Sequence, residues 1–224
     1  MGEKIGAFFS NESPFGQIMT RCGVVIAANI MFVLFSIPVI IIGPAYTALY
    51  YVLLKAVKNE WEINPFKEFW TGFKTNIKQG TIAGVIVTLL GIFLVMDIKI
   101  CTSAQGFIGA FKIPVYVLSI VFASTALYLF PTIAAFENKL KKLVFNSIFF
   151  AIKNPLKMLI IIIINVVPKV ISYIDTPNQP LYAFIWSFFG FGLLAAIGAT
   201  LLWPEFKPFI SNENVSKSDA DSQA

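Results

Sequence analysis

The sequence has 224 residues, of which 57% are hydrophobic and 13% charged, and its mean hydropathy is +0.78. Soluble domains carry about a quarter charged residues, so this composition excludes an ordinary soluble protein and indicates an integral membrane protein. The net charge of +5 is typical of lysines that face anionic lipid, and it does not indicate a nucleic-acid partner. Long runs of Val, Ile, Leu and Phe favour a helical bundle, because the strands of membrane barrels alternate apolar and polar residues.

The first apolar stretch is too long for one span. The chain has no charged residue between Cys22 and Leu54, and a helix of this length would be roughly 50 Å long against a hydrocarbon core of about 30 Å. One alternative is a single span followed by a surface helix. The segment Ala45–Val57 is apolar on every side, however, whereas a surface helix needs a polar face. We therefore expect a hairpin of two spans, at about Phe15–Ser36 and Ile40–Val57.

A basic amphipathic helix is predicted over Asn64–Gln79. Asn64 suits the N-cap and Pro65 suits the first helical position. Apolar residues recur along one side at helical spacing, namely Phe66, Phe69, Trp70, Phe73 and Ile77. The opposite side carries Lys67, Glu68, Thr71, Lys74, Thr75 and Lys78. We expect this helix to lie at the membrane surface, with its rings at the acyl boundary and its lysines among anionic headgroups, or to contact a partner protein.

Four more spans are predicted, which gives an all-α, polytopic transmembrane bundle. They are Thr81–Met96, Pro114–Ala135, Leu156–Val167 with some residues beyond, and Leu181–Trp203. With six spans and both ends inside, every Lys and Arg is cytoplasmic except Lys99, Lys112 and Lys169. A five-span alternative places the N-terminus outside and obeys the positive-inside rule less well. Both layouts put the C-terminus and the amphipathic helix in the cytoplasm.

A second candidate surface helix covers Leu140–Asn154. The segments Gly72–Lys78 and Ala151–Lys157 align at an offset of 79 residues, and each leads directly into a span. This similarity indicates a parallel repeat of the kind found in transporters, with chance similarity as the alternative. Residues 1–210 are thus predicted to form one transmembrane domain, and the Ser- and Asn-rich tail of residues 211–224 is predicted to be disordered.

Nothing in the sequence indicates catalysis. The chain has no histidine, which removes the commonest general base and the commonest metal ligand. The sequence also has no phosphate-binding loop, nucleophile elbow or paired-cysteine metal motif. We therefore expect a non-enzymatic protein without a cofactor or a metal.

The spans contain a few polar and small residues that need a role. Asn29 and Asn165 are the deepest amides, for which we expect hydrogen bonds between helices, with a polar substrate path as the alternative. The last span carries a stripe of small residues, Gly192, Ala195, Ala196 and Ala199. Such stripes let helices approach closely. Packing inside the bundle is expected, and a seam with a second copy or with a partner protein is the alternative.

A set of short motifs lies in about the first 80 residues. It comprises Phe8-Phe9-Ser10, Ser13-Pro14-Phe15-Gly16, Pro38-Val39, Gly43, Thr47-Ala48-Leu49-Tyr50-Tyr51, Lys55, Phe66, Phe69, Phe73-Lys74, Asn76 and Lys78-Gln79. This set resembles the YesL-like family of bacterial integral membrane proteins, a domain of unknown function. The sequence departs from the family pattern at Ile41, where Thr is usual, and at Ala45 and Tyr46, where small hydroxyl residues are usual.

The resemblance implies a biological setting. Members of this family are often encoded beside carbohydrate-uptake transporters and polysaccharide-degrading enzymes in Gram-positive bacteria. We therefore expect an accessory component of oligosaccharide uptake in the bacterial plasma membrane, in contact with subunits of a sugar transporter. A small solute permease and a membrane-sensing regulatory protein are the alternatives.

Overall fold

The computed structural model describes residues 13–104 and 107–221, except for the side chains of 107, 108 and 211–221. The described part is built of helices and contains no strand, which confirms the predicted all-α fold. Six helical stretches are long and apolar enough to cross a membrane, as the six-span layout predicts. Phe8 and Phe9 of the N-terminal motifs lie outside the described residues.

The first two candidate spans form the predicted hairpin. Helix α2 (Pro14–Phe35) begins at Ser13, whose Oγ accepts a hydrogen bond from the Gly16 amide at 3.0 Å. A short 3-10 turn, η1 (Val39–Ile41), then leads into α3 (Ile42–Lys58). The chain therefore reverses direction between α2 and α3, at the break predicted between Ser36 and Ile40.

Helix α3 lies at the centre of the molecule. It packs against α2, α4, α6 and α10, and most of its side chains are buried. Its residues with at most 1% exposure are Ala45, Thr47, Ala48, Leu49, Tyr50, Val52, Leu53 and Ala56. The uniform apolarity that predicted a span is thus explained by contact with protein on nearly all sides of α3.

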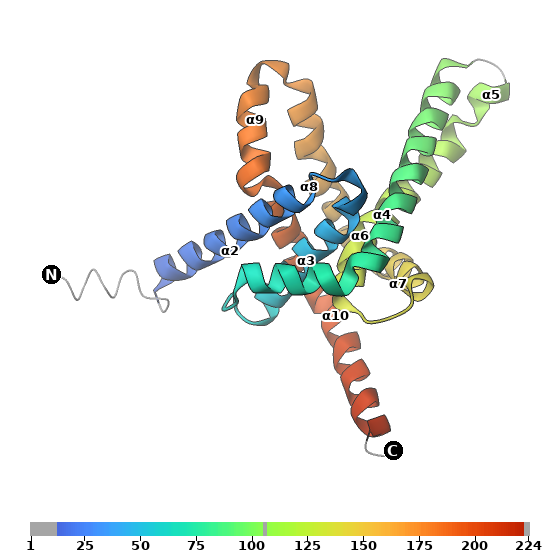
Figure 1. Cartoon of the computed structure of the whole chain (residues 1–224). Helices are drawn as coiled ribbons and strands as arrows, with labels where there is room; N and C mark the ends of the chain where they lie inside the picture. Colours follow the sequence, from blue (N-terminus) through green and yellow to red (C-terminus); the bar gives the residue numbers. More distant parts are fainter. Residues whose placement is uncertain (1–12, 105–106, 222–224) are drawn as a thin grey trace.

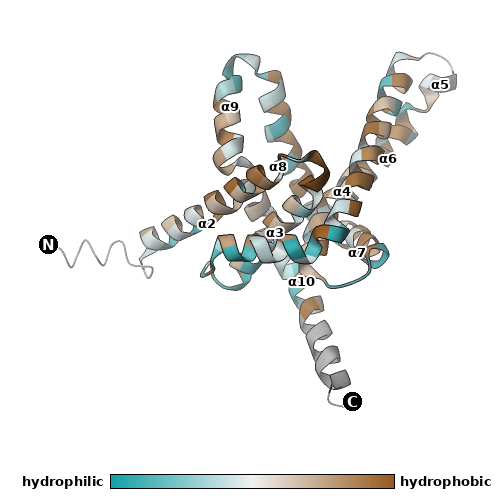
Figure 2. Cartoon of the chain, in the orientation of Figure 1, coloured by the Kyte–Doolittle hydropathy of each residue, from teal (hydrophilic) through white to brown (hydrophobic). Residues whose placement is uncertain are grey.

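Helix α4 (Pro65–Ser103) is continuous for 39 residues, and it joins the predicted amphipathic helix and the predicted third span. The predicted amphipathic helix thus leads directly into the predicted third span, as part of one helix. Figure 1 shows that the first part of α4 runs across the view and that the rest rises towards α5. We call residues 65–79 the amphipathic segment of α4. Its polar residues stand out from the apolar remainder of the helix (Figure 2).

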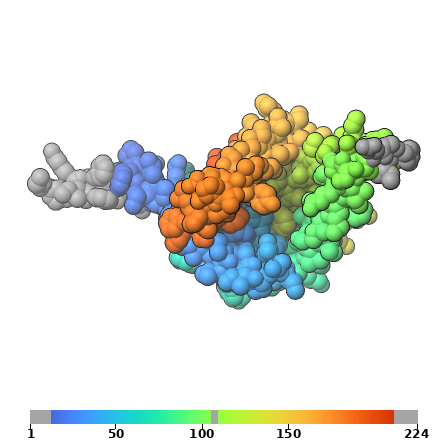
Figure 3. Space-filling view, turned by 90° about the horizontal axis from the view of Figure 1, so that it is seen from above, coloured from blue at the N-terminus to red at the C-terminus, as the bar shows by residue number. Residues whose placement is uncertain are grey.

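Two apolar helical pairs project from the centre as separate arms (Figures 1 and 3). One arm pairs the second half of α4 with α6, and the other pairs α8 with α9. Their elements are α5 (Phe107–Ala110), α6 (Lys112–Ala135), α8 (Pro155–Ile174), η2 (Thr176–Asn178) and α9 (Gln179–Ile185). At the tip of the second arm, hydrogen bonds from Asn178 and Tyr182 hold the pKa of Asp175 below its usual value.

The remaining elements complete the centre. Helix α7 (Leu140–Lys153) matches the second predicted surface helix to within one residue. A π-helical turn, η3 (Trp186–Gly190), precedes α10 (Phe191–Asp221). Helix α10 thus continues through most of the tail that was expected to be disordered. Extending an existing helix is much cheaper than nucleating one, which explains how polar residues can follow the apolar part.

Candidate functional site

The amphipathic segment of α4 begins as the sequence predicts. Asn64 Oδ1 accepts hydrogen bonds from the amides of Phe66 and Lys67, both at 3.2 Å, and Pro65 occupies the first helical position. The cap satisfies two backbone donors that have no partner inside the helix. The start of this helix is therefore specified locally.

Residues 65–84 of α4, which include the amphipathic segment, run antiparallel to α3 along nearly the whole of that helix. At one end, Lys55 Nζ lies 2.7 Å from Glu68 Oε2. At the other end, a Cβ added to Gly80 would lie 2.7 Å from Pro44 Cα, and one added to Gly43 would lie 2.9 Å from Gly84 Cα. Backbone therefore meets backbone at this crossing, which explains why glycines occupy it. The amphipathic segment is held along its length by α3.

This packing divides the predicted apolar stripe into two rows. Phe69 and Phe73 are 0% and 6% exposed, and their ring centroids lie 5.5 and 5.0 Å from that of Phe35 in α2. The expectation that these two rings contact lipid or a partner was therefore wrong. A helical stripe more than 100° wide can serve two neighbours, and one row here serves the core of this chain.

The other row is exposed. Phe66, Trp70 and Ile77 are 57%, 45% and 45% exposed. The ammonium group of Lys74 lies 4.8 Å from the centroid of the Trp70 ring, within the range of a cation–π interaction. We call this surface the α4 face and define it as Phe66, Lys67, Trp70, Lys74, Ile77 and Lys78, all of which are exposed.

A similar surface occurs on α7. Phe145 and Phe149 are 70% and 46% exposed, and both lie 79 residues after Phe66 and Trp70. Lys153 follows Lys74 at the same offset, and its ammonium group lies 5.1 Å from the Phe209 ring of α10. We call Phe145, Phe149, Ile152 and Lys153 the α7 face. It is the structural counterpart of the predicted second surface helix.

The helices that precede these two surfaces in the chain, α3 and α6, also share a motif that the sequence analysis missed. Ala45, Thr47, Ala48, Leu49 and Tyr50 of α3 recur in α6 at an offset of 78 residues, as Ala123, Thr125, Ala126, Leu127 and Tyr128. Tyr50 and Tyr128 are 1% and 0% exposed. The signal Ala-x-Thr-Ala-Leu-Tyr was available in the sequence. The repeat is thus clearer in α3 and α6 than in the surface helices that first indicated it.

Asn29 joins α2 to the π-helical turn. Its Nδ2 donates to the carbonyl oxygens of Trp186 and Ser187 at 3.1 and 2.8 Å, and its Oδ1 accepts from the Gly192 amide at 2.7 Å. A π turn leaves backbone groups without their usual helical partners, and such groups are costly inside a membrane. Asn29, which is fully buried, satisfies three of them.

The small residues of α10 lie inside the molecule. A Cβ at Gly192 would lie 2.7 Å from Val25 O, so a larger residue would push α2 away. Ala195 and Ala199 are fully buried, and Ala196 is 7% exposed. The stripe therefore packs within this chain.

Two further buried polar groups lie near α8. Asn165 is 2% exposed, and its Nδ2 donates to Ile161 O of its own helix at 3.0 Å, whereas its Oδ1 has no partner among the described residues. The hydrogen bond to another helix that we expected for Asn165 is therefore not formed within the described part of the chain. Glu205 of α10 is 4% exposed, and its Oε1 accepts from Asn154 Nδ2 at 2.6 Å and from Lys157 Nζ at 3.0 Å. This contact ties α10 to the junction of α7 and α8.

The chain is similar in sequence to bacterial proteins of unknown function. The model of the family "Protein of unknown function, DUF624" matches residues 25–98, which contain α3 and the amphipathic segment of α4. The uncharacterized protein YesL of Bacillus subtilis (strain 168) is 28% identical over 131 residues, which make up 57% of this chain and 61% of YesL. The uncharacterized protein YteU of the same strain is 23% identical over 110 residues, which make up 49% of this chain and 50% of YteU.

The matched regions thus span about half to three fifths of the length of these curated relatives. No solved structure matches the chain.

Proposed function

We propose that this chain, a YesL-like family protein of unknown function, is a non-enzymatic accessory component of carbohydrate uptake that contacts a transporter subunit through the α4 face. The α4 face is the observation that carries the proposal. Three large apolar side chains and three lysines share one exposed surface of a helix whose other side is fixed by α3 and α2. Aromatic residues on a rigid support are common at the centres of protein interfaces.

The polar groups of the spans favour this role over the permease alternative. All three hydrogen-bonding groups of Asn29 are used by the backbone of η3 and α10. Hydroxyl groups within the spans donate mainly to carbonyl oxygens four residues earlier in their own helices, as Thr47, Ser119 and Thr125 do. Side chains that are engaged in this way support the fold and are not available to a solute.

The carbohydrate setting and the cellular location come from the family resemblance. The lysines of the α4 face belong to the side that the positive-inside rule assigns to the cytoplasm. In this proposal the contact with the transporter subunit is made on that side of the bacterial plasma membrane, which also holds the C-terminus.

Co-purification in a mild detergent tests the proposal. We expect the wild-type protein to retain sugar-transporter subunits and the double variant Phe66→Ser, Trp70→Ser to lose them while its spans still insert. The matched control is Phe145→Ser, Phe149→Ser, which changes equivalent positions of the α7 face and should leave the complex intact. Absence of transporter subunits from the wild-type complex, together with normal oligosaccharide uptake after deletion, would contradict the proposal.

The same variants separate the alternatives. A membrane-sensing regulator would lose binding to anionic vesicles in the Phe66→Ser, Trp70→Ser variant and would never retain a transporter subunit. A permease would carry solute in proteoliposomes without any partner. Either result would contradict the accessory role and support the corresponding alternative.

A further inference from the structure

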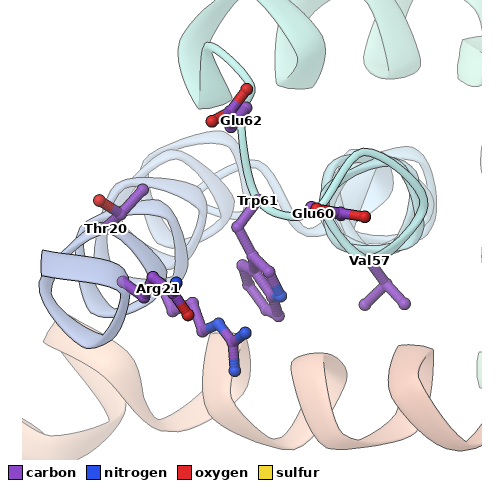
Figure 4. Close-up of a pocket in the computed structure, with 7 residues that line it drawn as sticks. Thr20, Arg21, Val57, Glu60, Trp61 and Glu62 are labelled. Carbon is purple, nitrogen blue, oxygen red and sulfur yellow. The ribbon is translucent and has the colours of Figure 1, made fainter. Parts of the chain in front are cut away.

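A polar pocket lies between the beginning of α2 and the turn that follows α3 (Figure 4). Its volume is about 310 Å³, which suits a small polar group. It is lined by Gln17, Thr20, Arg21, Val57, Glu60, Trp61 and Glu62. In Figure 4 the guanidinium of Arg21 and the indole of Trp61 lie next to each other, and the centre of the guanidinium is 5.9 Å from the ring centroid.

The turn that forms one wall has a strained backbone. After α3, the amide of Trp61 donates to Ala56 O at 2.7 Å, which is the hydrogen bond of a Schellman motif. Glu60 and Trp61 both have positive φ, at 52° and 71°, a region that favours glycine. Both side chains line the pocket. Strained non-glycine residues that gather at one cavity point to a use for their side chains.

The charges of the pocket do not neutralise one another. Arg21 carries the positive charge, and Glu60 and Glu62 carry the negative charges. Among the described residues, none of these three forms an ion pair. A guanidinium and two carboxylates at one cavity complement a ligand that has both an anionic and a cationic group. Arg binds phosphate well because its N–H groups can make two parallel hydrogen bonds, and an indole ring attracts an ammonium group.

The position of the pocket identifies the source of such a ligand. Gln17 and Arg21 lie in the first turns of one candidate span, and Val57 lies in the last turn of the next. Ile18 and Met19, beside them on α2, are 58% and 56% exposed. A ligand here would have an apolar surface for its tail and a polar pocket for its headgroup.

We propose that this pocket binds the headgroup of phosphatidylethanolamine, with Arg21 on the phosphate and with Glu60, Glu62 and the Trp61 ring around the ammonium group. The assignment goes beyond the proposed accessory role, because the pocket lies apart from the α4 face. The pocket makes the protein prefer a zwitterionic lipid, whereas its net positive charge alone favours anionic lipids.

Native mass spectrometry of the full-length protein, released from nanodiscs with equal amounts of phosphatidylethanolamine and phosphatidylglycerol, tests the proposal. We expect bound phosphatidylethanolamine to exceed phosphatidylglycerol in the wild type. Arg21→Gln, and the pair Glu60→Gln with Glu62→Gln, should each lower this ratio about threefold, the size expected for exposed charge contacts. Lys58→Gln, which removes a positive charge at the same end of α3 without lining the pocket, should leave the ratio unchanged.

Glu60→Gly provides a second readout that a purely structural role would not produce. Glycine relieves the strained φ, so this variant should unfold at a higher temperature than the wild type and still prefer phosphatidylethanolamine less. No enrichment of phosphatidylethanolamine in the wild type, or the same ratio in all pocket variants, would overturn the proposal. Equally tight binding of soluble glycerophosphoethanolamine would also overturn it, because the ligand would then be a soluble phosphoethanolamine compound.

Discussion

The unit α3–α4 and the unit α6–α8 place the same kinds of helix in the same order. Each begins with a helix that carries Ala-x-Thr-Ala-Leu-Tyr, continues with a basic amphipathic helix and ends in an apolar arm. They differ at the junction before the arm. In the first unit the helix is continuous past Gly80, whereas in the second it breaks between Lys153 and Pro155. The same order of elements is therefore held by different contacts.

The first unit is held mainly by its own two helices. Gly43 meets Gly80 and Gly84 backbone to backbone, and Lys55 pairs with Glu68. The second unit depends on α10. Glu205 of α10 binds the junction of α7 and α8, and the ring centroids of Phe209 and Phe149 lie 6.1 Å apart. Helix α10 thus covers part of the α7 face. The α4 face is better suited to bind a partner, and its helix connects directly to an arm.

The largest expected effect concerns the glycine crossing of the first unit. Gly43→Ala should reduce the free energy of unfolding by about 2 kcal/mol, because a Cβ there collides with the backbone of α4. The equivalent position of the second unit, Val121, is 53% exposed. Val121→Ala should therefore change the free energy of unfolding by less than about 0.5 kcal/mol. Unfolding in mixed micelles measures both values. Gly23→Ala, where an added Cβ meets nothing within 4 Å, is the control for the substitution itself.

The two ion pairs should differ next. Lys157→Met leaves Glu205, which is 4% exposed, with only Asn154 as a donor, and should cost about 1–2 kcal/mol. Lys55→Met removes a pair whose side chains are 36% and 14% exposed, and should cost about 0.5 kcal/mol. The same unfolding measurement applies. Equal costs for the two variants would contradict the view that only the second unit depends on a buried charge.

The smallest effect concerns the repeated tyrosines. The hydroxyl of Tyr50 interacts with Tyr46, whose ring centroid lies 5.2 Å from that of Tyr50, so Tyr50→Phe should cost about 0.5 kcal/mol. The hydroxyl of Tyr128 is buried and has no hydrogen-bond partner within the described part of the chain, so Tyr128→Phe should be neutral or slightly stabilising. A loss of stability in Tyr128→Phe as large as that in Tyr50→Phe would show that the two units are more alike than their contacts indicate.

Local signals in the sequence predicted much of this structure. The Asn64 cap, the apolar stretches and the charge-free hairpin depend on neighbouring residues, and the structure contains each of them. Features that depend on distant residues were missed. Phe69 and Phe73 looked like membrane anchors because periodicity cannot say that Phe35 covers them. Asn29 forms the expected hydrogen bonds between helices, but its partners lie more than 150 positions away and could not be named from the sequence. The burial of Glu205 required α7 and α8 to meet α10.

Site-specific photo-crosslinking in native membranes tests the role of the α4 face most directly. A benzophenone side chain placed at position 70, in the α4 face, is compared with one placed at position 149, the equivalent position of the α7 face. We expect position 70 to form a covalent adduct with a transporter subunit and position 149 to form none. Adducts from both positions at equal yield, or from position 149 alone, would contradict this role of the α4 face.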